Sequence, residues 1–262
     1  MKIGLVQFQS SADLEVNLNK MVEMTTALKS MGAEVVVFPE MAYLTGSSSV
    51  WSPKVNQYQS ILMKLQELAA ACKVVLIPGT LREPSKEKGK FHNSLPVINP
   101  YGQIVATYRK IHLFKANLPD RSYDEGKYCA PGTDTCVLES PYQFGLATCF
   151  DLRFPDQFSK LRAQGAKIIF LPSSFTVPTG KSHWKTLVSA RAIENQVFMV
   201  APGQVGVNGE GAETYGHSLV VGPWGDILCE MGNEEGYECV DLDLTQIDSA
   251  KSRIDLSPVP LS

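Results

Sequence analysis

This 262-residue chain has no long apolar run and no dense cluster of basic residues. None of its apolar runs approaches the length of a membrane-spanning helix, and the opening segment MKIGLVQFQS turns polar too early for a secretory signal peptide. The formal net charge is −3, which together with the scattered lysines and arginines argues against a nucleic-acid partner. We therefore expect a cytoplasmic protein that binds neither membranes nor nucleic acid.

Motifs for metal, redox and phosphate binding are also missing. The six cysteines form no C-x-x-C pair, and none of the four histidines stands four residues from another or at zinc-ligand spacing from a cysteine. The sequence GKS at 180–182 resembles the end of a phosphate-binding loop, but Phe175 occupies the position where that motif requires glycine. A disulfide framework is not expected in a chain of this length without an export signal. We predict free thiols, no metal and no cofactor.

The hydrophobic pattern predicts short buried strands interleaved with amphipathic helices. The run AEVVVFPE at 33–40 is typical of a strand buried on both faces, whereas apolar residues recur at helical spacing over 13–31. About ten strands are expected in all, together with four helices, at 13–31, 54–72, 155–164 and 183–195. The segments without a clear period are predicted as loops, at 41–53, 115–135 and after 204, with an irregular polar tail from 245.

Strand–helix units and hairpins follow one another without a linker. Turn residues at 100–102 and 223–225 indicate two β-hairpins among the βα units. This mixture predicts a layered α/β fold, built on one mixed sheet or on two sheets packed together. We expect a single domain over residues 1–262.

Cys149 stands at the most informative point of the chain. The apolar run 144–147 predicts a buried strand, and Pro155 marks the start of a helix shortly after it. Ligands bind where such strands end beside helix starts, so a thiol held there is a candidate nucleophile. The alternative is that Cys149 is a small buried hydrophobic residue, as most free cysteines are.

Two further strand ends carry groups that such a thiol would need. Glu40 ends the run 33–40, and Lys110 ends the second arm of the hairpin around 100–102. A carboxylate in a closed pocket can act as the base that takes the thiol proton, and an ammonium can stabilise the oxyanion formed at a carbonyl. Glu40, Lys110 and Cys149 thus form a complete set for acyl transfer from an amide or nitrile. Taken alone, Glu40 could also be an exposed loop residue, and a Cys–His pair is equally compatible with the spacing.

The chain resembles the carbon–nitrogen hydrolase (nitrilase) superfamily along its whole length. The matching segments include three that surround the candidate residues: FPE at 38–40, YRKIHLF at 108–114 and TCFDLRFP at 148–155. The resemblance implies a four-layer α-β-β-α sandwich and a Glu-Lys-Cys triad. It makes Glu40 the general base, Lys110 the oxyanion stabiliser and Cys149 the nucleophile.

Within this superfamily the chain is similar to the Nit branch of deaminated glutathione amidases and ω-amidases. That resemblance gives Glu125 the role of a second glutamate that orients the lysine or positions substrate, and it gives the Phe150 backbone N–H a place in the oxyanion hole. It also implies that Arg153 binds a substrate carboxylate, which suits the fork of a guanidinium. A structural ion pair between Arg153 and a nearby aspartate is the alternative. Departures from the branch pattern, such as Gly222 before PWG, concern the substrate more than the reaction.

We therefore predict a hydrolase that cleaves a small carboxylate-bearing amide through a cysteine thioester, without a cofactor. Deaminated glutathione and α-keto ω-amides are the substrates that the resemblance suggests. A nitrilase or N-carbamoyl amidohydrolase would use the same triad, and a catalytically idle interaction module is a third possibility. The resemblance also implies a homodimer or a larger homo-oligomer.

Overall fold

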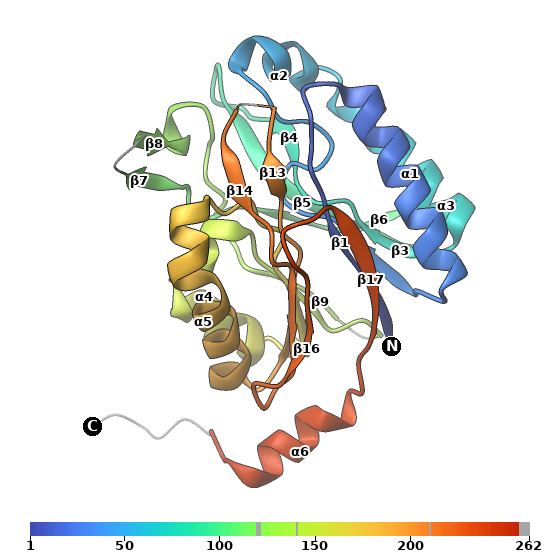
Figure 1. Ribbon diagram of the computed structural model, residues 1–262, viewed down its shortest axis with the longest axis vertical. Helices are drawn as coiled ribbons and strands as arrows, with labels where there is room; N and C mark the ends of the chain where they lie inside the picture. Colours follow the sequence, from blue (N-terminus) through green and yellow to red (C-terminus); the bar gives the residue numbers. More distant parts are fainter. Residues whose placement is uncertain (119–121, 140, 210, 257–262) are drawn as a thin grey trace.

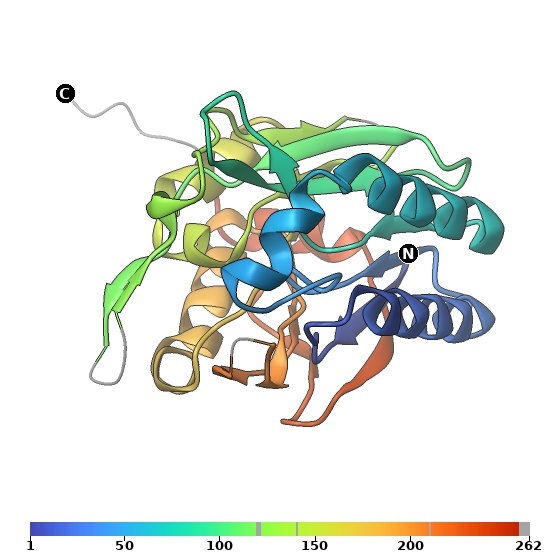
Figure 2. The ribbon, with the colours of Figure 1, turned by 90° about the horizontal axis from the view of Figure 1, so that it is seen from above.

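The computed structural model describes residues 1–118, 122–139, 141–209 and 211–256. Two β-sheets lie face to face, and helices cover the outer face of each sheet (Figures 1 and 2). This arrangement confirms the expected α-β-β-α sandwich. Parts of three predicted segments lie outside the described residues: 119–121 of the loop 115–135, residue 210 of the loop after 204, and 257–262 of the tail.

The first sheet has seven strands in the order β17-β1-β2-β3-β5-β4, with β6 paired to β5. Its three central strands β1, β2 and β3 are parallel, and its other pairings are antiparallel. The strand bounds are β1 Lys2–Gln7, β2 Val35–Val37, β3 Val75–Ile77, β4 Leu81–Pro84, β5 Phe91–Ile98, β6 Ile104–Arg109 and β17 Gly236–Asp241.

The second sheet has six strands in the order β16-β15-β12-β11-β10-β9, of which β10, β11 and β12 are parallel. Two short hairpins, β7–β8 and β13–β14, stand apart from the two large sheets. The bounds are β7 Lys115–Asn117, β8 Ser122–Asp124, β9 Cys136–Leu138, β10 Phe144–Leu146, β11 Ile168–Phe170, β12 Phe198–Ala201, β13 Val205–Val207, β14 Glu213–Tyr215, β15 Leu219–Val221 and β16 Ile227–Glu230.

The helices divide between the outer faces of the two sheets. Helices α1 and α3 pack on the first sheet, and α4 and α5 pack on the second (Figure 1). Asp13 caps α1 as its sequence position predicts, because its carboxylate accepts hydrogen bonds from the N–H groups of Glu15 and Val16. The helix bounds are α1 Leu14–Ser30, α2 Ser48–Val55, α3 Tyr58–Cys72, α4 Pro155–Ala163, α5 Val177–Asn195 and α6 Thr245–Arg253, with short 3₁₀ helices η1 Glu125–Lys127 and η2 Cys149–Arg153.

Alternation along the strands explains why their sequences are apolar throughout. In β2, Val36 points to the helix layer, while Val35 and Val37 point to the space between the sheets. In β11, Ile169 points to α4 and α5, and its neighbours Ile168 and Phe170 point to the first sheet. Each central strand is thus buried on both faces, and polar residues such as Glu40 after β2 and Cys149 after β10 lie at the edge where the strands end.

Several segments predicted as irregular contain regular structure. The described residues form six α-helices where four were predicted, because α2 lies partly within the predicted loop 41–53 and α6 within the predicted tail. The loop 115–135 contains β7, β8 and η1, and the glycine-rich segment after 204 forms the β13–β14 hairpin. These elements are short and bury few side chains: α6 buries only Ile247 and Ala250, so its sequence shows no helical period.

Helix α5 begins at Val177, six residues before the predicted start at 183. Pro178 lies in its first turn, which is a favourable position for proline. Gly180 made this turn resemble a loop in the sequence. In the structure the glycine is required by close packing, because a Cβ atom there would lie 2.3 Å from the ring of Tyr215.

Candidate active site

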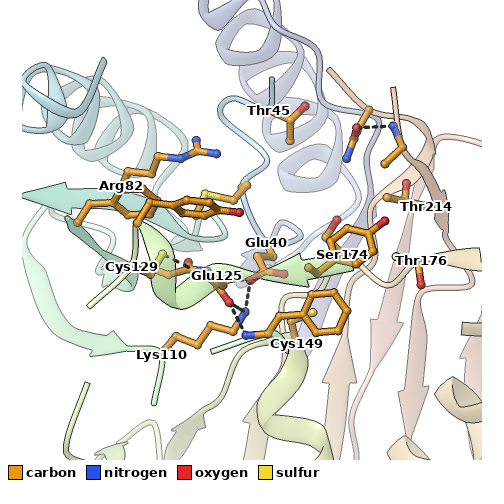
Figure 3. A pocket seen from close by; sticks show the side chains of 18 residues that line it. Glu40, Thr45, Arg82, Lys110, Glu125, Cys129, Cys149, Ser174, Thr176 and Thr214 are labelled. Carbon is orange, nitrogen blue, oxygen red and sulfur yellow. Dashed lines mark hydrogen bonds and ion pairs between the residues drawn. The ribbon is translucent and has the colours of Figure 1, made fainter. Parts of the chain in front are cut away.

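Strand ends from both sheets converge on one cavity of about 160 Å³ (Figure 3). Glu40 lies three residues after β2, Lys110 directly after β6, and Cys149 three residues after β10. All three line the cavity, together with Glu125 from η1. The structure therefore brings together the four residues that the sequence and the family resemblance singled out.

Cys149 has a backbone conformation that residues other than glycine rarely adopt. Its φ angle is +47°, and its N–H donates a hydrogen bond to the carbonyl oxygen of Pro172 at 3.0 Å. The chain turns at this point from β10 into η2, and the turn leaves the side chain at the cavity wall. Lys73 and Gln196 adopt it where helices α3 and α5 end, but Cys149 adopts it at a cavity wall, and strained residues of this kind cluster at functional sites.

A buried network fixes the turn that carries Cys149. The Asp151 carboxylate is fully buried and accepts hydrogen bonds from the Tyr108 hydroxyl at 2.6 Å and the Thr148 N–H at 2.8 Å. It also accepts a bond from the His112 N–H at 3.1 Å, and the His112 ring lies 2.8 Å away through Nδ1. Since Asp151 joins η2 to the residues after β6, the network fixes the position of Cys149 relative to Lys110.

Lys110 lies between two carboxylates. Its Nζ is 2.9 Å from Glu40 Oε1 and 2.9 Å from Glu125 Oε2, and the residue is only 2% exposed. The amide of Asn93 also joins the two acids, since its Nδ2 donates to Glu40 Oε1 at 2.9 Å and to Glu125 Oε1 at 3.0 Å. Asn93, on β5, was missed in the sequence. It stands between two other polar residues, His92 and Ser94, so no local pattern distinguishes it.

The charges of the site follow from this geometry. Burial opposes a charge on Lys110, but the carboxylates of Glu125 and Glu40 outweigh it and hold the lysine pKa well above its ordinary value. Burial would likewise raise the pKa of Glu125, yet Lys110 and the N–H of Phe114 bring it below its usual value. In the resting site Lys110 is therefore charged and Glu125 is ionised.

The Cys149 thiol, unlike Lys110 and Glu125, is uncharged in the resting site. Burial raises its pKa well above the ordinary value, and the nearby negative charge of Glu40 raises it further. Lys110 and the backbone N–H of Ser174 act in the opposite direction without reversing the shift in the thiol pKa. The resting nucleophile is thus a neutral thiol in the same cavity as a base, and it needs that base to ionise.

Glu125 is held by more than the lysine. Its Oε2 accepts the Phe114 N–H at 2.8 Å, and the Cys129 thiol donates to its Oε1 at 3.6 Å. Burial raises the Cys129 pKa, and the Glu125 charge raises it further. Cys129 is therefore a neutral donor in the same cavity, although nothing in the sequence distinguished it from the other cysteines.

Arg153 and Phe150 line a smaller cavity of about 20 Å³ that shares Cys149 with the first. The Arg153 guanidinium lies 5.9 Å from the centre of the Phe150 ring, and its Nη2 is 3.3 Å from His183 Nδ1. Among the described residues no carboxylate lies within ion-pair distance of Arg153, and the nearby Asp151 is engaged with other donors. The alternative role of Arg153, a structural ion pair with an aspartate, is not observed in the described part of the chain.

Comparison with known proteins identifies the family. The family model described as carbon–nitrogen hydrolase matches residues 2–252. The chain belongs to the carbon–nitrogen hydrolase family. It is an enzyme of the amidase class, as the sequence predicted.

Similar proteins include members of the Nit branch. The deaminated glutathione amidase of Synechocystis is 32% identical over 255 residues, covering 95% of this chain and 94% of that protein. The human omega-amidase NIT2 is 30% identical over 257 residues, covering 97% and 92%. The crystal structure of Nit3 from Saccharomyces cerevisiae, a nitrilase-superfamily member, is 28% identical with a TM-score of 0.85, covering 98% of this chain and 95% of that one.

The described residues contain neither a candidate membrane-spanning helix nor a metal-binding cluster. No helix in the described ranges is both long and apolar enough to cross a membrane. The same residues contain no group of three or more His, Cys, Asp or Glu side chains arranged to hold a metal ion.

Proposed function

We propose that this enzyme hydrolyses a small carboxylate-bearing amide through a thioester on Cys149. The observation that carries the proposal is that Cys149, Glu40 and Lys110 line one cavity, in which Glu40 bonds to the charged Lys110. A nucleophile, a base and a cation thus lie together where a substrate can reach them.

The first half of the reaction forms the acyl-enzyme. Glu40 takes the thiol proton while the sulfur attacks the amide carbon, and the negative charge moves to the carbonyl oxygen. The Lys110 ammonium and the Phe150 backbone N–H stabilise that oxyanion. When the C–N bond breaks, Glu40 gives its proton to the departing nitrogen, and ammonia or an amine leaves.

The second half releases the acid. Glu40 takes a proton from a water molecule, the resulting hydroxide adds to the thioester carbon, and Lys110 again faces the oxyanion. The C–S bond then breaks, the proton returns to the sulfur, and a carboxylic acid is released. No other reactant is needed in either half.

Glu125 keeps Lys110 charged during these steps. Each time Glu40 takes a proton it loses its negative charge, and Lys110 is left with Glu125 as its remaining anionic partner. Since the pKa of Glu125 is lowered, this carboxylate stays ionised throughout. Glu125 is therefore a positioning residue that acts through Lys110.

Arg153 supports a substrate with a carboxylate in its acyl part. Its guanidinium lies beside Cys149, and no described carboxylate neutralises it. The names of the similar proteins suggest deaminated glutathione or an α-keto ω-amide as the substrate. A nitrile or N-carbamoyl substrate is compatible with the same triad, whereas an idle interaction module leaves the convergence of Cys149, Glu40 and Lys110 on one cavity unexplained.

We further propose that the enzyme acts in the cytoplasm as a homodimer or larger homo-oligomer. The oligomer rests on resemblance to the Nit branch, and the cytoplasmic location is the expectation drawn above from the composition. Light scattering coupled to size-exclusion chromatography should give a mass of at least twice 28.7 kDa. A mass of one chain across the accessible concentration range would refute the oligomer.

The decisive experiment compares the wild type with Cys149→Ala. We expect the wild type to release ammonia from α-ketoglutaramate or a dipeptide from deaminated glutathione, and the variant to release neither. Cys72→Ala, which changes a cysteine at the end of α3, is the matched control and should retain activity. Undiminished turnover by Cys149→Ala would refute the mechanism, and preferred turnover of nitriles or carbamoyl amino acids would refute the substrate class.

A further inference from the structure

A second arginine lines the active-site cavity, and neither the triad nor the acyl-binding residue accounts for it. Arg82 lies on β4 and is only 6% exposed. Its Nη1 donates to the Leu44 carbonyl at 3.0 Å and to the Tyr43 hydroxyl at 3.3 Å. Its side chain reaches the cavity that holds Glu40 and Glu125 (Figure 3).

The charge of Arg82 is not matched by any described carboxylate. No acidic side chain of the described residues lies within 4 Å of it, and its Nε has no hydrogen-bond partner there. Aromatic rings surround the guanidinium instead, with the centres of Trp51, Phe91 and Tyr43 at 5.1, 5.5 and 5.9 Å. Burying a cation costs free energy unless an anion accompanies it, so the Arg82 site is suited to bind an anionic group of a substrate.

Arg82 and Arg153 occupy different sides of the reacting groups. Figure 3 shows Arg82 on one side of Glu40, and Ser174 and Thr176 on the other. Those two residues also line the small cavity of Arg153. Arg82 lines the same cavity as Glu40, Glu125 and Cys129, so the guanidinium shares this cavity with both acids.

The order of the reaction steps shows which part of the substrate lies on which side of the cavity. The acyl group stays on Cys149, next to Arg153, while the leaving nitrogen takes its proton from Glu40. The amine part of the substrate must therefore lie on the Glu40 side of the cavity, towards Arg82.

We propose that Arg82 binds a carboxylate carried by the leaving amine, so that the preferred substrate is an amide with one carboxylate on each side of the scissile bond. This inference rests on the proposed function. It favours a substrate that releases an amino acid or a peptide over one that releases ammonia. A guanidinium and a carboxylate match in geometry, and their charge-assisted bonds are strong in a buried site.

The test uses three substrates with the same acyl group. Deaminated glutathione carries a carboxylate on its leaving dipeptide, its C-terminal carboxamide lacks that charge, and α-ketoglutaramate releases only ammonia. We expect the wild type to prefer the first. Arg82→Gln should lower kcat/KM for it about 10- to 100-fold, mainly through KM, because a charge-assisted hydrogen bond is lost.

The controls separate binding from folding. Arg82→Gln should leave the other two substrates nearly unchanged, whereas Arg153→Gln should impair all three. Arg82→Lys should restore part of the preference, because it restores the positive charge. The melting temperature of each variant shows whether it is folded.

Two results would overturn the inference while the proposed function stands. One is a wild type that turns over deaminated glutathione and its carboxamide equally well. The other is an Arg82→Gln enzyme that loses the same factor on all three substrates, which would mean that Arg82 supports the cavity wall. A folded wild type that hydrolyses none of the three would refute the proposed function and the inference with it.

Discussion

Replacing Glu125 with glutamine removes one negative charge and leaves the shape of the side chain almost unchanged. The carboxylate accepts Lys110 Nζ at 2.9 Å, the Phe114 N–H at 2.8 Å and the Asn93 amide at 3.0 Å. A glutamine has one acceptor oxygen, so at least one of these donors must face its NH₂ group. Glu125→Gln therefore weakens the support of Lys110 without opening a cavity.

The size of the effect follows from the contacts that are lost. A hydrogen bond to a charged group contributes about 1.5–3 kcal/mol, so we expect a loss of that order in the free energy of unfolding. The same interaction energy is lost in the transition state, in which Lys110 faces the oxyanion and Glu40 is protonated. It should lower kcat about 10- to 100-fold, with a smaller change in KM.

The stability difference between wild type and Glu125→Gln should depend on pH. The pKa of Glu125 in the folded protein is below its ordinary value of 4.5, so its contribution is present above pH 4.5. As the pH falls through the lowered pKa, the carboxylate is protonated in both states and the difference disappears. Urea unfolding at a series of pH values between neutral and acidic measures this convergence.

Glu83→Gln provides the matched control. Glu83 is also a partly buried glutamate in an ion pair, with its oxygens 2.6 and 2.8 Å from Arg109, but it does not line the cavity of Cys149. We expect this variant to lose stability and keep its kcat. If Glu125→Gln retained wild-type kcat, or if both variants lost kcat equally, the role assigned to Glu125 would be refuted.

Three further predictions concern binding, the turn and the backbone. Arg153→Gln should raise KM for carboxylate-bearing amides about 10- to 100-fold without changing the melting temperature, and an unchanged KM would contradict its role. Asp151→Asn should destabilise the fold by about 1–3 kcal/mol in urea unfolding and lower kcat, because buried donors lose their acceptor; wild-type stability would show that the network is not needed. Gly79→Ala should cut both activity and stability, because its Cβ would lie 1.8 Å from the oxygen of Pro39, whereas Gly89→Ala, also at positive φ, meets nothing within 4 Å and should remain active. Equal activities of the two alanine variants would contradict the last argument.

The central strands and the convergence of Glu40, Lys110 and Cys149 on one cavity could be predicted because each has a local signal. A β-branched run followed by a charged residue, as at Val35–Val37 and Glu40, indicates both the buried strand and the edge where it ends. The motifs around Lys110 and Cys149 carry the resemblance to the family. The four layers follow from that resemblance more than from hydrophobic pattern, which left one sheet or two as alternatives.

The remaining features depend on contacts between distant segments. Asn93 reaches Glu40 and Glu125 only because β5 lies next to β6 in the folded sheet, and no local pattern marks it. Arg82 looks like an ordinary charged residue on an edge strand, and its burial results from aromatic rings contributed by other elements. Helix α2 lacks a buried face, so hydrophobic spacing could not reveal it.

The central claim is that the acyl group is carried by Cys149. The most direct measurement is peptide mapping by mass spectrometry after the wild-type enzyme is mixed with deaminated glutathione and quenched within the first turnover. The account predicts the mass of the acyl group on the peptide that contains Cys149, and no such mass on the peptide that contains Cys129. Acylation of Cys129 instead, or continued turnover by Cys149→Ala, would contradict it.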